Sequence, residues 1–219
     1  MIITIDGPAA AGKGTLASAI AQKYKYAYFD TGMVYRAVGL QMILNKKDLS
    51  DEESAVDYAK KLTFPLMMEL SEHAEFRSSK GGQAASIVSA ITGVRKALLS
   101  MQQNFALNPV FADGTKANGV VYDGRDTGTV VCPNAELKLF VTASPEVRAK
   151  RRFAEFQQKN MPAVYEDVLA DIKARDERDS KRATAPLKPA EDALTIDTSD
   201  LNIAEVFAKV DELIKAKMK

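Results

Sequence analysis

The sequence is poor in the residues that build disulfides and thiolate or imidazole metal centres. Its 219 residues include one cysteine, Cys132, and one histidine, His73. A single cysteine cannot form an internal disulfide, which suits a reducing compartment. One thiol and one imidazole also exclude most zinc sites. We expect Cys132 to be buried and inert and His73 to lie on the surface.

Strong net charge and long hydrophobic runs are also missing. The formal net charge is +1, so no overall field favours nucleic acid or a membrane surface. No apolar run approaches the roughly 20 residues that a membrane-spanning helix needs. The N-terminus does not have the pattern of a signal peptide. We therefore expect a cytoplasmic protein, binding neither nucleic acid nor membrane, in which 46% hydrophobic residues form one globular core.

The most informative feature that is present lies at the N-terminus. A β-branched run over 1–6 is followed by the loop GPAAAGKGT at 7–15 and then by an apolar helical pattern. Strand, glycine-framed loop, lysine and helix predict a P-loop, whose backbone N–H groups bind phosphate. Lys13 is expected to reach the outer phosphates. Gly14 stands where Ser or Thr usually follows the lysine, so Thr15 supplies the nearest hydroxyl.

Strand-like and helical segments alternate along the chain. The expected strands are 2–5, 27–29, 120–122, 137–141 and 194–196, with 64–70 weakly strand-like. The main expected helices are 13–25, 33–46, 50–62, 83–105 (with Gly93 as a possible division), a helix starting at 144–146, 164–182 and 202–217. This alternation predicts an α/β P-loop three-layer fold, with a five-stranded parallel sheet flanked by helices. Ligands bind at the carboxyl ends of such strands.

The positions of the arginines indicate phosphoryl transfer in addition to nucleotide binding. Phosphoryl transfer between two nucleotides spreads negative charge over the moving group, and guanidinium groups stabilise that charge. Arg175, Arg178 and Arg182 fall at i, i+3 and i+7 on one helical face, with Asp179 beside them. The alternative for the charged stretch 148–182 is a solvated helix face.

Five motifs resemble those of bacterial cytidylate kinases. They are ITIDGPAAAGKGT (3–15), FDTGMVYRAV (29–38), AASIVSAITGVRKALL (84–99), DGRDTGTVVCP (123–133) and ARDERDSKRATAPL (174–187). The resemblance covers nearly the whole chain. It implies a single domain over 1–219, with a core at about 1–35, 84–145 and 185–219, a monophosphate-binding part at about 36–83 and a lid at about 146–184. It also implies the reaction of ATP with CMP or dCMP, giving ADP and CDP or dCDP, with Mg²⁺.

The resemblance also implies a role for each matched residue. The residues implied to bind ATP are Gly7, Ala10, Ala11, Gly12, Lys13, Gly14, Thr15, Arg151 and Arg152. Those implied to bind CMP are Thr31, Tyr35, Arg36, Ser86, Arg95, Arg125, Asp126, Arg175, Asp179 and Arg182. Lys13, Arg125, Arg175 and Arg182 are implied to be catalytic, and Thr15 to reach Mg²⁺ directly or through water. A carboxylate that accepts from the cytosine amino group disfavours UMP, because uracil has a carbonyl there.

The chain departs from the family pattern at several places. Ala10 replaces a common glycine, which is tolerable if φ is negative there, and Thr31 replaces the commoner serine but retains the hydroxyl. The stretch 62–77 is shorter than the usual monophosphate-binding insert, which normally forms a small antiparallel sheet. We therefore expect a shortened subdomain there. Conversely, the loop-like stretch 108–120 is longer than usual.

Two alternatives to a CMP kinase stay open at this stage. One is another small-acceptor P-loop kinase, acting on UMP, AMP or shikimate. The other is a P-loop NTPase or nucleotide-binding module that transfers no phosphoryl group to a second small molecule. The expected partners are ATP and CMP or dCMP alone, and the expected state is a monomer.

Overall fold

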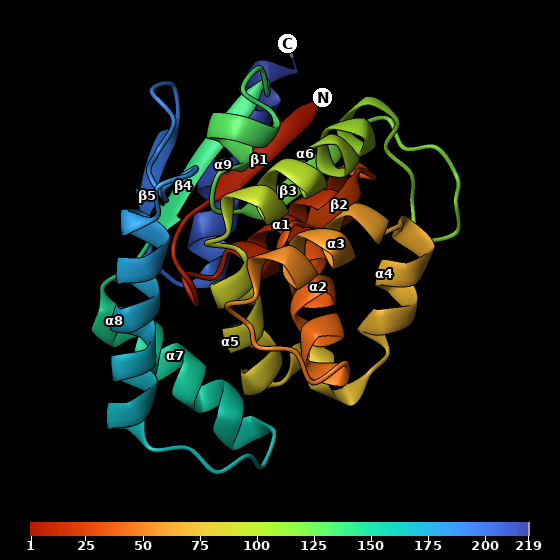
Figure 1. The fold of residues 1–219 in the computed structure, drawn as a ribbon. Helices are drawn as coiled ribbons and strands as arrows, with labels where there is room; N and C mark the ends of the chain where they lie inside the picture. Colours follow the sequence, from red (N-terminus) through yellow and green to blue (C-terminus); the bar gives the residue numbers. More distant parts are fainter. Residues whose placement is uncertain (219) are drawn as a thin grey trace. The chain divides into compact units, whose positions relative to one another are not determined.

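In the computed structural model, which describes residues 1–218, five strands form one parallel sheet in the order β2-β3-β1-β4-β5. The strands are β1 (Ile2–Asp6), β2 (Ala27–Asp30), β3 (Val120–Gly124), β4 (Leu137–Thr142) and β5 (Leu194–Asp197). The central strand β1 pairs in parallel with β3 and β4, and β4 pairs with β5 (Figure 1). The predicted α/β fold is therefore confirmed.

The chain forms two compact units. Of the described residues, unit 1 comprises 1–29, 109–181 and 185–218, and unit 2 comprises 30–108 and 182–184. Unit 1 contains α1 (Lys13–Tyr24), the π-helical turn η2 (Thr127–Val131), α7 (Pro145–Gln158), α8 (Tyr165–Lys181) and α9 (Ile203–Lys217). Unit 2 contains α2 (Gly32–Leu44), α3 (Glu52–Lys61), α4 (Phe64–Ser71), the short 3₁₀ helix η1 (Ala74–Arg77), α5 (Ser79–Val88) and α6 (Thr92–Leu107).

The core of unit 1 is built on the central strand. Ile3 and Ile5 of β1 are fully buried, and so is Thr4 between them. Burial on both faces is expected of a central strand in a parallel sheet, because helices cover both sides. The helices α1 and α9 add Leu16 and Ile214 to this core, which anchors the helix that follows the P-loop.

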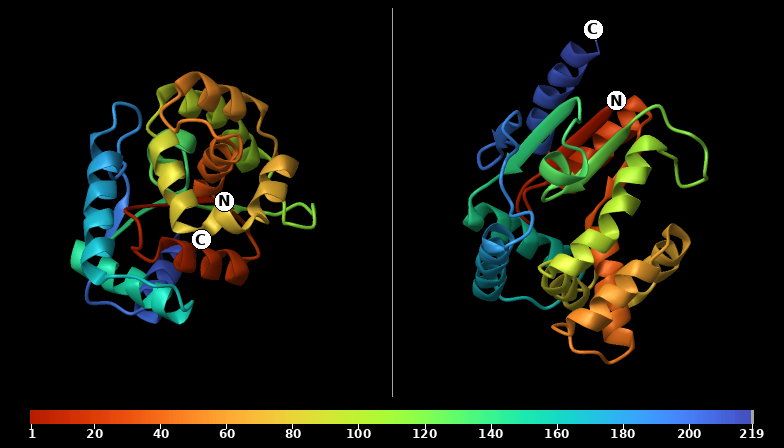
Figure 2. Two further views of the ribbon diagram at one scale, coloured as in Figure 1. Left: turned by 60° about the horizontal axis from the view of Figure 1, so that its bottom comes forward. Right: turned by 45° about the horizontal axis from the view of Figure 1, so that its top comes forward.

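The helices α7 and α8 form a small cluster of their own within unit 1. They pack against each other around Ala149, Val168 and Ile172, and the segment 159–164 joins them (Figure 2). Ser144 caps α7 by accepting a hydrogen bond from the backbone N–H of Val147, as its position before Pro145 predicts. The predicted charged helix over 164–182 is present as α8, within a residue at each end.

Unit 2 consists of helices packed through small residues. A Cβ on Gly39 of α2 would lie 2.9 Å from the Cβ of Ala84 on α5, so only glycine allows this close approach. The helix α3 packs on α6, where Gly93 lies against Val56. None of the described helices is long and apolar enough by itself to cross a membrane, although α5 and α6, bent by 101°, pass that test of length and composition as a pair.

One prediction for unit 2 is wrong, and another needs a small adjustment. The segment 64–70, predicted to be weakly strand-like, is the helix α4, because Thr63 caps it through Leu66 N and Pro65 occupies its first turn. The predicted helix over 83–105 is divided, as its glycine allowed, into α5 and α6, and the break at 89–91 lies just before Gly93. The shortened insert is therefore helical over the described residues 64–71 and 74–77, without the small antiparallel sheet that is usual in the family.

Candidate active site

The loop between β1 and α1 has the geometry of a P-loop. Gly7 has φ 149°, and a Cβ there would lie only 1.9 Å from the carbonyl oxygen of Val141. Gly12 has φ 88° and is the N-cap of α1, where no side chain caps the helix. The loop thus requires glycine at both positions, and it leaves the first N–H groups of α1 available to a phosphate.

The backbone at Ala10 is left-handed. Its φ is 59°, so the condition of a negative φ, under which alanine would be tolerated without strain, is not met. Loop closure between Gly7 and Gly12 imposes this conformation, which costs a residue with a Cβ roughly 1–2 kcal/mol. Ala10 therefore stores strain in the middle of the P-loop, where backbone strain commonly accompanies function.

Lys13 is a buried cation at the start of α1. It is 5% exposed, and its Nζ donates a hydrogen bond to the carbonyl oxygen of Pro8 at 2.9 Å. The carboxylate of Asp123 lies 3.7 Å from the same nitrogen. Burial, the largest cause, and the positive charge of Arg125 together lower the pKa of Lys13 to about 8, whereas Asp123 opposes both effects. An arriving phosphate would relieve this unfavourable environment by supplying negative charge.

The glycine that follows Lys13 has a steric explanation. A Cβ on Gly14 would lie 3.2 Å from Oδ2 of Asp123, which is tighter than ordinary contact. Asp123, the last residue but one of β3, begins the predicted DGRD motif and adds a carboxylate beside the P-loop, a role that sequence reasoning missed. The motif itself could have indicated it, because it lies at the carboxyl end of a strand of a parallel sheet.

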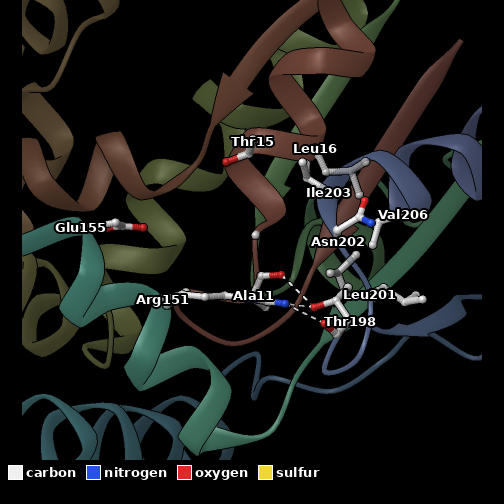
Figure 3. A pocket seen from close by; sticks show the side chains of 13 residues that line it. Ala11, Thr15, Leu16, Arg151, Glu155, Thr198, Leu201, Asn202, Ile203 and Val206 are labelled. Atoms are coloured by element: carbon white, nitrogen blue, oxygen red, sulfur yellow. Dashed lines mark hydrogen bonds between the residues drawn. The ribbon is translucent and has the colours of Figure 1, made fainter. Parts of the chain in front are cut away.

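A pocket of about 310 Å³ lies next to the P-loop, entirely within unit 1. Arg151 extends toward Ala11 and Thr198 (Figure 3), and its guanidinium donates to the Thr198 hydroxyl at 3.0 Å and to the Thr198 carbonyl at 2.6 Å. Thr15 also lines the pocket. Of the two lid arginines predicted to bind ATP, the structure brings Arg151 to this pocket. Arg152 instead pairs with Glu155 at 2.8 Å.

Most residues that line the pocket were not predicted from the sequence. The lining residues that were missed are Leu16, Val141, Glu155, Thr198, Leu201, Asn202, Ile203 and Val206. Several of them lie in the turn after β5 and the first turn of α9, at the carboxyl end of a strand. Their position could have indicated a ligand site, because ligands bind at the carboxyl ends of parallel strands. These residue types, however, are too common in turns and helix caps to indicate a ligand by themselves.

Three predicted residues meet around one buried carboxylate. Asp179 of α8 accepts a hydrogen bond from Nε of Arg125 at 3.0 Å, and Nε of Arg175 lies 3.9 Å from the same oxygen. Arg125 also donates to the carbonyl oxygen of Gly124. Two guanidinium groups thus flank one carboxylate, which leaves a net positive charge suited to a phosphate. The predicted contact of Asp179 with sugar hydroxyls stays a prediction.

Arg148 is a buried arginine without a predicted role. It is 3% exposed and forms two hydrogen bonds with the carboxylate of Asp176 on α8, at 3.0 and 2.6 Å. It also donates to the carbonyl oxygens of Ala143 and Ala9. This side chain therefore ties α7 and α8 to the P-loop, and the sequence distinguished it in no way from neighbouring surface arginines.

Two of the predicted acceptor residues of unit 2, Tyr35 and Arg95, are in contact with each other. The Arg95 guanidinium lies over the ring of Tyr35, 5.1 Å from its centroid, and donates to the carbonyl oxygen of Ser89 at 3.0 Å. Arg36 donates to the carbonyl oxygen of Phe76 at 2.8 Å, so the short insert holds this arginine. Thr31, Ser86 and Arg182 are also buried in unit 2, and Asp126 is buried in unit 1.

The side chains present suit magnesium bound through a nucleotide rather than a protein cage. Residues 1–218 contain no group of three or more His, Cys, Asp and Glu side chains arranged to hold a metal ion. Mg²⁺ prefers oxygen ligands and is commonly held by one or two protein groups together with substrate phosphates. Thr15, an exposed residue at the end of the P-loop, and Asp123 beside the loop carry oxygen donors of this kind.

The expectations for the two scarce residues can also be compared with the structure. Cys132 is buried at 6% exposure, and burial raises the pKa of its thiol to about 11, so the prediction of an inert thiol is supported. His73 is exposed as predicted, and its Nδ1 accepts a hydrogen bond from Glu75 N at the start of η1. Neither residue takes part in the clusters described above.

The parallel sheet and P-loop place the protein in the class of P-loop α/β proteins, and a shikimate kinase from Bacteroides thetaiotaomicron shares its fold. The TM-score is 0.50 at 15% identity, covering 98% of each chain. A family model described as cytidylate kinase matches residues 3–216. The cytidylate kinase of Xanthobacter autotrophicus is 48% identical over 99% of this chain and 98% of its own. That of Paramagnetospirillum magneticum is 49% identical with the same coverage. The chain therefore belongs to the cytidylate kinase family.

Proposed function

We propose that the protein transfers a phosphoryl group from ATP to CMP and dCMP, giving CDP and dCDP by direct in-line displacement. The observation that carries the proposal is a family match over nearly the whole chain, combined with a P-loop whose lysine is buried and close to a carboxylate. Kinases of this family use ATP, so a nucleotide donor follows from membership. The identity of the acceptor rests on the names of the relatives and on the matched motifs.

Unit 1 is the proposed site of the donor nucleotide. The P-loop amides and Lys13 would bind the β- and γ-phosphates, because the helix dipole and the buried cation both favour negative charge. The pocket lined by Arg151 and Thr198 would take the adenosine part of ATP. Thr15 and Asp123 would hold Mg²⁺, directly or through water, and the ion would neutralise charge that develops on the transferring phosphoryl group.

The acceptor residues are proposed from the family motifs. Thr31, Tyr35 and Arg36 would bind the monophosphate of CMP, together with Arg125 and Arg175. Cytosine would be recognised by Ser86, Arg95 and Asp126, since its amino group donates to a carboxylate and its ring nitrogen accepts from a guanidinium. The burial of all three at 3–6% suits base recognition, because a wrong base would leave a buried polar group unpaired.

Catalysis is proposed to depend on alignment and charge rather than on a general base. The acceptor phosphate already carries the attacking oxygen in ionised form near neutral pH. Lys13, Arg125, Arg175 and Arg182 would stabilise the charge spread over the transferring group. Closure of the lid helices α7 and α8 would exclude water and so prevent hydrolysis of ATP.

The alternative of a P-loop NTPase is not favoured. Asn45–Asp48 match the letters of the guanine-reading pattern Asn-Lys-x-Asp that such proteins usually carry. The structure places them in the exposed turn that ends α2, where Asn45 is the C-cap and Asp48 accepts from Ser50. They do not follow a strand of the sheet, so the letter match carries no base-binding geometry.

One assay separates the candidate functions. Purified protein is mixed with ATP and Mg²⁺, and ADP release is measured with AMP, CMP, dCMP, UMP or shikimate as acceptor, and with no acceptor. We expect fast release with CMP and dCMP and almost none without an acceptor. Equal release with and without CMP would instead indicate an NTPase, and preference for another acceptor would identify the other kinase.

The cytoplasmic location and the monomeric state expected from the sequence belong to this proposal as well. Light scattering coupled to gel filtration would give the mass of one chain if the monomer prediction is correct. A mass of two chains would contradict it.

A further inference from the structure

The strand β1 ends in a buried carboxylate directly before the P-loop. Asp6 is 4% exposed, and its Oδ1 accepts hydrogen bonds from the backbone N–H of Thr127 at 2.9 Å and from the Thr127 hydroxyl at 2.8 Å. Its Oδ2 accepts from the backbone N–H of Gly128 at 2.8 Å. Burying a carboxylate costs free energy unless hydrogen bonds compensate it. The three hydrogen bonds from Thr127 and Gly128 supply this compensation and fix those two residues to β1.

The groups that Asp6 binds belong to the first turn of η2. The N-terminus of a helix presents unpaired N–H groups, and an aspartate at the N-cap usually accepts from them with its own side chain. Asp126 is the N-cap of η2, but its side chain makes no capping bond there. Asp6 accepts the hydrogen bonds of these N–H groups instead, although it lies 121 residues before Thr127 in the sequence. The cap of η2 therefore comes from the strand that carries the P-loop.

Packing leaves η2 little freedom on this strand. A Cβ on Gly128 would lie 2.9 Å from the hydroxyl oxygen of Thr4 and 3.4 Å from Oδ2 of Asp6. In the sheet, Asp6 pairs in register with Gly124, the residue before Arg125. The backbone that carries Arg125 and Asp126 is thus attached to β1 on both sides, at Gly124 through the sheet and at Thr127 and Gly128 through Asp6.

We propose that Asp6 is a positioning residue for the acceptor nucleotide. By capping η2 from β1, it holds the turn at 125–126 and relieves Asp126 of the capping role, so that the Asp126 carboxylate is presented to cytosine and the Arg125 guanidinium to phosphate. The inference rests on the proposed function, because that function assigns Arg125 and Asp126 to CMP. Asp6 acts through η2 and not by contact with either nucleotide.

The main test is the substitution Asp6→Asn. Asparagine has nearly the same shape, but its amide N–H₂ would face either Gly128 N–H or the Thr127 donors, so that a donor meets a donor. We expect the KM for CMP to rise about tenfold, the cost of one such conflict, while the KM for ATP changes less than about threefold. The ratio of kcat/KM for CMP to that for UMP should fall severalfold, since that ratio reports how the base is read.

Two further variants separate positioning from general destabilisation. Thr127→Val removes one donor to Asp6 without changing any charge, and it should raise the KM for CMP by about threefold. Thr129→Val removes a hydroxyl from the same turn that contacts the Asp126 carbonyl oxygen at 3.4 Å and not Asp6. It should leave both KM values unchanged. The double variant Asp6→Asn/Thr127→Val should be less impaired than the product of the single effects.

The readouts keep this inference distinct from the proposed function. Hydrogen exchange at the amides of Thr127 and Gly128 needs no substrate, and it should be at least about tenfold faster in Asp6→Asn than in the wild type. Unchanged exchange, or equal rises in KM for ATP and CMP, would overturn the positioning role. If Asp6→Asn does not fold, equal effects of Thr127→Val and Thr129→Val would overturn it. A wild-type protein inactive on CMP would contradict the proposed function and leave the exchange test decisive.

Discussion

At the scale of single residues, the site is determined by charges held away from water. Lys13 and Asp123 lie together beside the P-loop, and Arg125 and Arg175 flank the carboxylate of Asp179. Each cation is partly compensated by a carboxylate, which reduces the cost of burying it. Phosphate can compensate the remaining charge, so these clusters are prepared for anions before any ligand arrives.

The lowered pKa of Lys13 predicts how ATP affinity depends on pH. In the free protein its pKa is about 8, so the ammonium loses its proton as the pH rises through that value. Phosphate binds the protonated form, so the Kd for ATP should rise above pH 8, by up to about tenfold per pH unit. Binding measured calorimetrically between pH 7 and 9.5 tests this. Lys13→Arg stays charged over the range, so its own Kd should not show the rise, and a flat wild-type profile would contradict the prediction.

The same pKa has a consequence for stability, with an unusual sign. The pKa of Lys13 is lower in the folded protein than its ordinary value of 10.5, so the unfolded chain binds more protons between pH 8 and 10.5. The penalty of a buried ammonium is thus fully present below pH 8 and is relieved as the pH rises through that window. Other groups also change the free energy of unfolding as they titrate. Their effect cancels when the free energy of unfolding of the wild type is compared with that of Lys13→Met at each pH.

Substitution of Ala10 by glycine should stabilise the protein. Glycine adopts φ 59° without strain, and this gain of roughly 1–2 kcal/mol exceeds the about 0.4–1 kcal/mol by which glycine favours the unfolded chain. Urea denaturation should therefore show a net gain of up to about 1.5 kcal/mol. Gly12→Ala is the matched comparison and should destabilise, because φ is 88° there. A loss of stability in Ala10→Gly would show that the loop is not strained.

The proposed role of Asp126 gives a prediction about substrates. Asp126→Ala removes the carboxylate proposed to accept from the cytosine amino group. The KM for CMP should therefore rise by about ten- to a hundredfold, the cost of one charged hydrogen bond, and the KM for ATP should change little. Steady-state kinetics with each nucleotide varied in turn checks this. Equal changes for both nucleotides would remove Asp126 from the acceptor site.

At the scale of helices and strands, close backbone approach decides how unit 2 packs. The contact of Gly39 with Ala84 joins α2 to α5, and these helices carry Arg36 and Ser86. The helix α6 carries Arg95, whose guanidinium lies over Tyr35 of α2. The spacing between helices thus controls the distances between the predicted acceptor residues, and small side chains set that spacing.

The substitution Gly39→Ala tests this packing. Alanine is the better helix former, by about 1 kcal/mol, but its Cβ would lie 2.9 Å from Ala84 Cβ. Overpacking of this kind costs roughly 1–3 kcal/mol, so we expect lower stability in thermal or urea unfolding. Gln41→Ala, a partly exposed position on the same helix, should change stability little. A stabilised Gly39→Ala variant would show that α2 and α5 can separate without cost.

At the scale of the whole molecule, the two units carry different parts of the proposed reaction. The P-loop and the pocket by Arg151 belong to unit 1, and Tyr35, Arg36 and Arg95 belong to unit 2. The expected division of the chain into core, monophosphate-binding part and lid stays a prediction. A kinase must order both nucleotides before transfer. The P-loop and its pocket should therefore respond to ATP and the helices of unit 2 to CMP, although Arg125, Asp126 and Arg175 of unit 1 are also assigned to CMP.

Hydrogen exchange with single ligands tests that division. A non-hydrolysable ATP analogue with Mg²⁺ should slow exchange at the P-loop and in 198–206, and CMP alone should slow exchange in α2, α5 and the first turns of α6. Binding stabilises the region that it orders, in proportion to ligand excess over Kd. Shikimate serves as the non-binding control. Protection of 198–206 by CMP alone would contradict the proposed pocket for adenosine.

Much of the fold could be predicted because its signals are local. The order of strand, glycine-framed loop, Lys13 and helix predicts the P-loop, and short apolar runs predict the strands within one or two residues. The helix α4 was missed because capping by Thr63 and Pro65 outweighed an apolar run without clear periodicity. The positive φ of Ala10 was missed because closure of the loop, and not the residue itself, imposes it.

The sequence by itself determined the parallel α/β fold, the P-loop and the membership in a kinase family, since each depends on residue types at fixed spacings. The tertiary structure alone decided which charges meet. The pairing of Lys13 with Asp123, of Arg125 with Asp179, and of Asp6 with the first turn of η2 joins residues about 50 to 120 positions apart. Such pairings follow from the order of strands in the sheet and the packing of helices on it, and no local pattern encodes them.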